Sequence, residues 1–393
     1  MGERQRAGGG ATASAPGGRA AGMTTAPPPS RRSPTATRLV QLGLAAAALA
    51  LAFSAPMFLR PYLVGLLSVT LIYALFAMSI NLLAGWAGLV SVGHAGIMAS
   101  AGYGVAYIAR EGGNHGLQLA VGLAMGMLVS LIFGLMAMRT TEVYFLMITL
   151  ALGMVVWGLT YRMAGITGGE NGLRGILRPP PIAAYWNYYY LCLVIFLVCF
   201  GLVWLITRSP VGLTLQGLRD SESRATALGY NPALYKCYAF VISGFFATIA
   251  GILYVWYHQF ISPAIAEFLQ SGIGVLMVIL GGVGTLIGPL VGAAVVTWIE
   301  NVVSGFIGRW PTVMGLIFIF VVLFARDGLV GGVSRLWRRS YRRRSPTAGG
   351  QADASAAAPG AGPVDHTVTG MEPAASQERS ASPRRAKPSR EKQ

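Results

Sequence analysis

The chain has 393 residues, of which 54% are hydrophobic and only 11% are charged. Soluble domains carry about 25% charged residues, so this composition excludes an ordinary soluble domain and predicts an integral membrane protein. The net charge of +16 comes almost entirely from arginine, most of it near the two chain ends and in one internal loop. That placement is typical of membrane orientation rather than of nucleic-acid binding.

Composition changes sharply towards both ends. Residues 1–38 and 333–393 are rich in Arg, Ala, Gly, Pro and Ser, so both are predicted to be disordered basic tails. A secretory signal peptide is the alternative for the first tail, but the basic leader is long and no clear cleavage site follows the first apolar run. The region between the tails, 39–332, is predicted to be the transmembrane domain.

Apolar runs near or above the ~18–20 residues that cross a bilayer repeat through this domain. About ten transmembrane helices are predicted, some short or broken, over 39–57, 62–83, 88–109, 117–138, 143–162, 188–207, 237–257, 269–284, 289–306 and 311–326. Segments on the inside of this alternation carry 24 of the 30 Lys and Arg residues, and segments on the outside carry six. The all-α chain is therefore predicted to have both ends in the cytoplasm, with 208–236 as a cytoplasmic loop.

A charged stretch within 208–236 separates two long apolar runs. Residues 221–228 are predicted to form a short amphipathic helix, which Gly229 can end in a left-handed conformation and Pro232 prevents from continuing. A short helix lying along a membrane surface is well shaped to be contacted and moved by another protein. An ordinary solvated loop is the alternative.

The third predicted segment has a glycine every few residues from Gly85 to Gly102. Irregular backbone at membrane depth is tolerated only where it is buried in protein or lines a wet cavity, and broken helices often form transport sites. Asn81, Ser91 and His94 are therefore candidates to line a pathway. The alternative is close helix packing through the glycines, with His94 hydrogen-bonded to a backbone carbonyl.

Two further stretches also leave alternatives open. Tyr144, Phe145 and Thr149 begin the fifth segment and are interpreted either as pathway lining or as anchors at the membrane interface. Thr167 and Asn171 lie in a glycine-rich outer loop, 166–173. The N–H groups of this loop either cradle a carboxylate or belong to a plain tight loop.

Little in the sequence points to catalysis. The stretch 281–293 resembles a nucleotide-binding loop but lacks the Lys-Ser/Thr pair of a Walker A motif. No nucleophile–base constellation is visible, and the three cysteines have no metal-ligand spacing or disulfide framework. Glu300 is the clearest carboxylate within an apolar segment, and mid-membrane ionisable groups are typical of ion-coupled carriers. A stand-alone secondary carrier or channel using His94 and Glu300 is therefore the alternative function.

Several short motifs follow one another over residues 62–332. They are Ser79–Gly85 with Gly88-Leu89, Tyr144-Phe145 with Thr149–Ala151, Ile166–Gly169 with Asn171-Gly172, Ser209–Gly212 with Arg219-Asp220 and Ala227–Gly229, Gly281–Thr285 with Gly288-Pro289, and Arg326–Leu329. In this order and spacing the chain resembles the inner-membrane permease subunits of branched-chain amino acid ABC transporters, in particular the LivM-like subunits.

The resemblance implies an all-α, multi-pass subunit of the cytoplasmic membrane that is not an enzyme and binds no cofactor or metal. Its implied partners are a related permease in a heterodimer, two cytoplasmic ATPase subunits that use ATP, and an extracytoplasmic solute-binding protein. The resemblance also implies that the polar loop contains the coupling helix, the element that contacts the ATPases. The residues expected to make these contacts are Arg219, Asp220, Glu222, Arg224, Ala225, Ala227 and Gly229. The family's Glu-Ala-Ala…Gly signature lacks its first Glu here, where Arg224-Ala225-Thr226 precedes Gly229.

The implied substrate path runs between the two permeases. Candidate lining residues are Asn81, Ser91, His94, Tyr144, Phe145, Thr149, Thr167, Asn171 and Thr285, and structural glycines are Gly85, Gly88, Gly168, Gly169, Gly281, Gly282, Gly284 and Gly288. The binding protein is expected to dock near 164–187 and 258–268. The implied substrates are branched-chain amino acids or a related small polar solute such as urea or an amide.

Overall fold

The computed structural model describes residues 49–306, together with residues 43, 47, 312, 313, 315, 316, 319, 328 and 329. The predicted tails, 1–38 and 333–393, and most of the predicted tenth segment, 311–326, lie outside these residues.

The described chain is helical apart from one two-residue strand pair. After a short apolar helix, Leu49–Phe58, the elements are α2 (Pro61–Asn81), η1 (Leu82–Ala87), α3 (His94–Arg110), α4 (His115–Ala137), α5 (Glu142–Arg162), α6 (Ala164–Thr167), η2 (Gly169–Asn171), β1 (Leu173–Arg174), η3 (Pro180–Ile182), α7 (Tyr185–Arg208), α8 (Pro210–Asp220), α9 (Glu222–Ala227), α10 (Pro232–His258), β2 (Phe260–Ile261), η4 (Pro263–Ala266), α11 (Phe268–Gly281) and α12 (Gly288–Phe306).

Six of the described helices are long and apolar enough to cross a membrane: α2 with its continuation η1, α4, α5, α7, α10 and α12. Helices α3 and α11 are apolar but shorter, with 17 and 14 residues. The prediction of an all-helical, multi-pass membrane protein is therefore confirmed. The count of ten spans and their orientation remain predictions.

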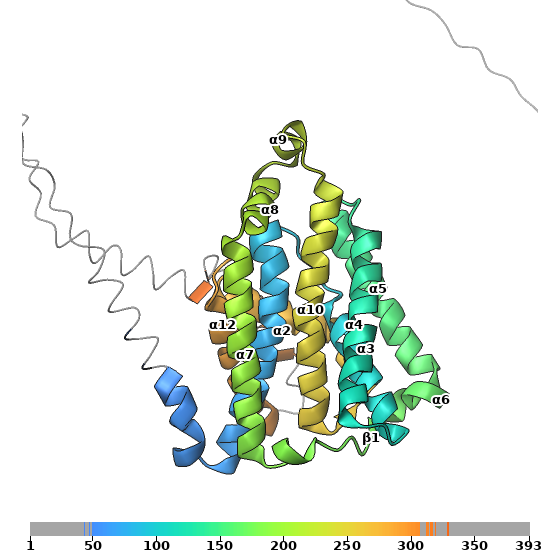
Figure 1. Ribbon diagram of the computed structural model, residues 1–393, viewed down its shortest axis with the longest axis vertical. Helices are drawn as coiled ribbons and strands as arrows, with labels where there is room; N and C mark the ends of the chain where they lie inside the picture. The colour runs from blue at the N-terminus through green and yellow to red at the C-terminus, as the bar shows by residue number, and fades with distance from the viewer. Residues whose placement is uncertain are drawn as a thin grey trace, which may run out of the picture. The chain divides into compact units, whose positions relative to one another are not determined.

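Helices α2 and α10 form the centre of the bundle. In their most apolar windows 72% of residues are buried, against 28% or 33% in α4, α5, α7 and α12. The peripheral helices leave large apolar side chains exposed, as expected for surfaces solvated by lipid. Figure 1 shows α8 and α9 at one end of the bundle, called here the α9 end, and β1 at the other, called the loop end.

The chain is irregular where the glycine-rich third segment was predicted to break. Helix α2 continues into the π-helical turn η1, which ends at Gly88 with a φ of 72°. This left-handed conformation suits glycine. The chain then runs without regular structure to His94, where α3 begins.

The glycines within α3 do not interrupt it. They instead let neighbouring helices approach, because a Cβ added at Gly104 would lie 3.2 Å from the Cα of Gly122 in α4, and one at Gly96 would lie 3.4 Å from the Cα of Gly153 in α5. The break is thus confined to 88–93, and the remaining glycines act through helix packing.

The polar loop is more ordered than the sequence suggested. The predicted short helix is present as α9, and Gly229 has a φ of 89°. Helix α8 was not predicted. Its signal was present in Ser209-Pro210, because the Ser209 hydroxyl caps the helix at the N–H of Gly212 and Pro210 occupies the first helical turn.

Candidate functional site

Helix α9 projects beyond the apolar helices at the α9 end (Figure 1). Ala225 is the one buried residue among the seven predicted coupling residues. The other six are exposed: Arg219, Asp220, Glu222, Arg224, Ala227 and Gly229. Leu228 and Tyr230, just beyond the helix, expose 77% and 42% of their surfaces. A groove of about 530 Å³ between α8 and α9 is lined by Leu213, Leu228, Tyr230 and the charged Asp220 and Arg224. An apolar groove with charges beside it is suited to a protein partner.

Lys236 fixes α9 to the rest of the bundle. Its ammonium group forms an ion pair with Glu222 and donates a hydrogen bond of 3.1 Å to the backbone oxygen of Thr140, in the turn between α4 and α5. The Lys236 side chain is only 8% exposed. A force on α9 therefore has a direct contact through which it reaches α4 and α5.

Arg219 provides a second connection, from α8 to the irregular segment. Its guanidinium group donates a hydrogen bond to the backbone oxygen of Gly85 in η1. Its aliphatic stem lies over Gly88, where a Cβ would come within 2.7 Å of the Arg219 Cγ. The residue thus contacts both the interior of η1 and the glycine that ends it.

Asn81 extends this connection to the α11–α12 loop. Its side-chain nitrogen donates to the backbone oxygen of Thr285 at 2.9 Å, and its side-chain oxygen accepts from the N–H of Gly284 at 2.9 Å. A Cβ at Gly85 would lie 2.6 Å from the Cα of Gly284, so the two backbones are in close contact. Arg219, η1 and the α11–α12 loop therefore form one continuous series of contacts.

His94 belongs to a buried hydrogen-bond network. The Ser243 hydroxyl donates to the backbone oxygen of Ser79 at 2.6 Å, so it has no second proton to give to the imidazole. The His94 Nε2–H therefore donates to Ser243 Oγ, at 2.6 Å, and Nδ1 accepts from the Ser91 hydroxyl, at 2.9 Å. The neutral ring holds the broken segment against α10 and α2. Its partners are hydroxyls rather than the backbone carbonyl expected from the sequence.

Replacing His94 by leucine is expected to lower stability by about 1–3 kcal/mol, because the Ser91 and Ser243 hydroxyls lose a buried partner. The measurement is the midpoint of thermal unfolding in detergent. We expect uptake per folded molecule to stay close to the wild-type value. Unchanged stability together with abolished uptake would instead place His94 in a proton or substrate path.

The other predicted pathway residues are scattered. Phe145 and Thr149 are buried in the core, Thr167 is buried at the end of α6, Thr285 is half-buried, and Tyr144 and Asn171 are exposed. Thr149 accepts a hydrogen bond from the N–H of Val92 at 3.3 Å. None of the nine candidates lines the cavity between α2, α7, α10 and α12 that is described below.

The structural-glycine candidates lie in three places: η1 with Gly88 at its end, the loop 166–173 and the α11–α12 connection. In the loop 166–173, the N–H groups of Gly168, Gly169 and Gly172 are bonded to Ala164, Thr167 and Gly169. This favours the tight-loop interpretation over an anion cradle, since these donors are already occupied. Gly281, Gly282, Gly284 and Gly288 form the compact α11–α12 connection.

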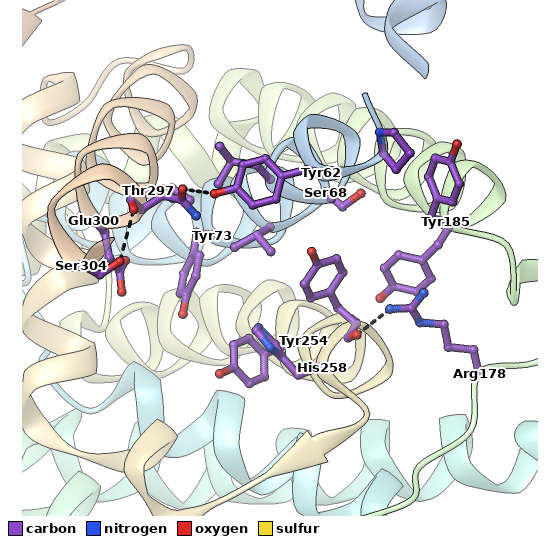
Figure 2. Close-up of a pocket in the computed structure, with 17 residues that line it drawn as sticks. Tyr62, Ser68, Tyr73, Arg178, Tyr185, Tyr254, His258, Thr297, Glu300 and Ser304 are labelled. Carbon is purple, nitrogen blue, oxygen red and sulfur yellow. Dashed lines mark hydrogen bonds between the residues drawn. The ribbon is translucent and has the colours of Figure 1, made fainter. Parts of the chain in front are cut away.

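Sequence reasoning missed a cavity of about 590 Å³ near the loop end, between α2, α7, α10 and α12. Figure 2 shows its polar side chains: Tyr62, Ser68, Tyr73, Arg178, Tyr185, Tyr254, His258, Thr297, Glu300 and Ser304. Of these, only Glu300 was singled out from the sequence. The tyrosines come from helices far apart in the chain, so no local pattern indicated that they meet.

Arg178 forms one wall of this cavity. It donates to the backbone oxygens of Trp256 and Tyr257, at 2.7 and 2.5 Å, and its guanidinium lies 4.6 Å from the ring centre of Tyr188. It thereby attaches the segment between β1 and η3 to the end of α10. The pairing of β1 with β2 makes the same connection a few residues away.

These features define a class of protein: a helical, multi-pass membrane protein with a projecting polar helix and an internal cavity, and no catalytic centre in its described residues. The family described as the permease component of branched-chain amino acid transport systems matches residues 62–326. The chain belongs to that family of ABC transporter permeases, whose members are transport subunits and not themselves ATPases.

Individual relatives are more distant. The high-affinity branched-chain amino acid permease protein LivM of Escherichia coli K12 is 25% identical over 312 residues, covering 72% of this chain and 73% of LivM. BraD of Pseudomonas aeruginosa, named for the same kind of transport, is 27% identical over 165 residues, or 42% of this chain and 52% of BraD. The autoinducer 2 import permease LsrC of Yersinia pestis is 27% identical over 175 residues, or 40% of this chain and 48% of LsrC.

A solved ABC transporter of the metal-chelate type, in an inward-facing conformation, has a TM-score of 0.45 and 17% identity, covering 73% of this chain and 98% of that one. That score is too low to support a conclusion about this chain.

Proposed function

We propose that this permease is one half of an ATP-driven importer that carries branched-chain amino acids across the cytoplasmic membrane. Family membership over 62–326 supports the class, and the likeness to LivM over 73% of its length supports the substrate. The likeness to LsrC, named for a different cargo, makes another small polar solute such as urea or an amide the alternative.

The projecting α9 is the single observation that carries the mechanism. It is exposed at one end of the bundle and is joined to α4 and α5 through Lys236. We assign α9 as the coupling helix, which rests on one of two cytoplasmic ATPase subunits. Closure of the ATP-bound pair then moves α9, and the spans rock from an outward-open to an inward-open state.

The orientation follows from this assignment. The α9 end faces the cytoplasm, in agreement with the excess of Lys and Arg on the predicted inner segments. About ten spans with both chain ends inside satisfy this orientation. The loop end then faces outward, where 164–187 and 258–268 form one surface through the β1–β2 pair and Arg178. The binding protein docks there.

The partner permease completes the substrate path, so a heterodimer is the assembly we propose. The path residues predicted from the sequence are kept as candidates for lining this path. Asn81 and His94 are the weakest of them, because both are already bonded within the protein. A stand-alone carrier using His94 and Glu300 is less well supported, because His94 already has both ring nitrogens bonded.

The test is a pair of variants at the exposed face of α9, Arg224→Glu and Gly229→Asp. Each adds a negative charge where the ATPase is proposed to dock. We expect both to reduce ATPase co-purification and uptake. Arg60→Glu reverses an exposed charge at the other end of the bundle, just before α2, and is the control that leaves ATPase co-purification unchanged. Wild-type ATPase binding and uptake in both variants would show that α9 is not the coupling helix.

A further inference from the structure

The cavity near the loop end contains two polar groups that have no partner within the part of the chain that the structure describes. Among the described residues, the Glu300 carboxylate has no hydrogen-bond or ion-pair partner. The hydroxyl of Thr297, a residue that is only 4% exposed, likewise has none. Both lie on α12, three residues apart and so on one face of the helix, and both line the cavity. Burying a carboxylate within a membrane-spanning helix costs free energy, so such a group usually marks a functional site.

A third polar group lies across from them on α2. The Tyr73 hydroxyl oxygen accepts a hydrogen bond of 2.9 Å from the Gln270 side chain, and its second lone pair can accept another from a cation. Glu300, Tyr73 and Tyr254 line the same cavity. The rings of these tyrosines meet edge to face with centroids 6.2 Å apart. A carboxylate beside aromatic rings is a favourable environment for a cation.

The remaining walls suit the other parts of an amino acid. Leu66 and Val69 share the cavity face of α2 with Tyr73, at helical spacing, and present an apolar surface. Arg178 lies across the cavity from Glu300 (Figure 2). Opposite charges on opposite sides favour a zwitterion in one orientation, with its ammonium group towards Glu300. A volume of about 590 Å³ is within the usual range for small-molecule sites.

We propose that Glu300, Thr297 and Tyr73 form a subsite for the ammonium group of the amino acid on its way through the permease. The ammonium donates to the carboxylate of Glu300 and to the hydroxyl of Thr297, and the apolar side chain of the substrate lies against Leu66 and Val69. This inference rests on the proposed function, because it takes an amino acid as the cargo. It adds a specificity element within the permease, separate from the binding protein.

The experiment measures binding of radiolabelled L-leucine to the purified transporter complex without the binding protein. The competitor is 2-hydroxy-4-methylpentanoate, which differs from leucine by a hydroxyl in place of the ammonium. We expect unlabelled leucine to compete and the hydroxy acid not to. Glu300→Gln is expected to weaken leucine binding by about tenfold or more, the usual effect of losing a charged hydrogen bond, and Thr297→Val to weaken it less.

Glu111→Gln is the matched control. This exposed glutamate follows α3 and does not line the cavity, so the same chemical change there should leave leucine binding unaltered. Size-exclusion profiles confirm that each variant assembles. Wild-type affinity in Glu300→Gln, equal competition by the hydroxy acid, or no leucine binding to the wild-type complex would each overturn the subsite. If the subsite is overturned but ATPase subunits still co-purify with the wild-type permease, the proposed function is retained. If no ATPase subunit co-purifies with the wild-type permease, the proposed function itself is refuted.

Discussion

Replacing Arg219 by methionine is expected to reduce uptake by about tenfold or more, since a charged hydrogen bond between α8 and η1 is lost. Methionine keeps most of the aliphatic stem that lies over Gly88 but cannot donate to the Gly85 carbonyl. Movement of α9 then no longer reaches the turn at the end of α2, or the α11–α12 loop beyond it. The measurements are ATP-dependent uptake in vesicles and basal ATP hydrolysis, and only uptake is expected to fall.

Arg208→Met is the control for this variant. Arg208 belongs to the same loop region but lies over the ring of Trp204 at 4.4 Å, at the end of α7. Removing its charge should therefore leave the connection to η1 intact. Normal uptake in Arg219→Met, or an equal loss in both variants, would rule out the proposed connection through Gly85.

Gly251→Ala is expected to destabilise the protein by about 1–3 kcal/mol or more, through overpacking of a close helix crossing in the core. A Cβ at Gly251 in α10 would overlap the backbone oxygen of Met98 in α3, and backbone atoms cannot move aside as a flexible side chain can. The measurement is the midpoint of thermal unfolding in detergent, with expression level as a second indicator.

The matched control makes the same substitution where there is room. A Cβ at Gly201, in α7, has no atom within 4 Å, so Gly201→Ala should be neutral or slightly stabilising through helix propensity. Equal midpoints for the two variants would mean that α3 and α10 are not packed as closely as described.

Local sequence patterns were sufficient for the helices. Long apolar runs placed α4, α5, α7, α10 and α12 within a few residues of their observed ends, because hydropathy and helix length are properties of one segment. The end of α9 at Gly229 was predicted for the same reason, since it depends on glycine at a left-handed position. The sequence indicated a broken segment between Gly85 and Gly102 but did not locate the break at 88–93.

Contacts between distant segments were not predictable in this way. Arg219 and Gly85 are separated by 134 positions, and His94 and Ser243 by 149. The cavity combines Tyr73, Tyr254 and Glu300 from three helices. A single sequence contains no signal that brings such residues together, so Thr297 was overlooked and His94 received more weight as a pathway residue than its contacts support.

The measurement that tests the central claim most directly is ATP hydrolysis by the complex that co-purifies with the tagged permease. It is recorded with no binding protein, with leucine-loaded binding protein and with urea-loaded binding protein. The account predicts that ATPase subunits co-purify and that the leucine-loaded protein stimulates hydrolysis. Stimulation by the urea-loaded protein alone would contradict the proposed substrate. A permease that brings down no ATPase and transports by itself in vesicles would contradict the proposed mechanism.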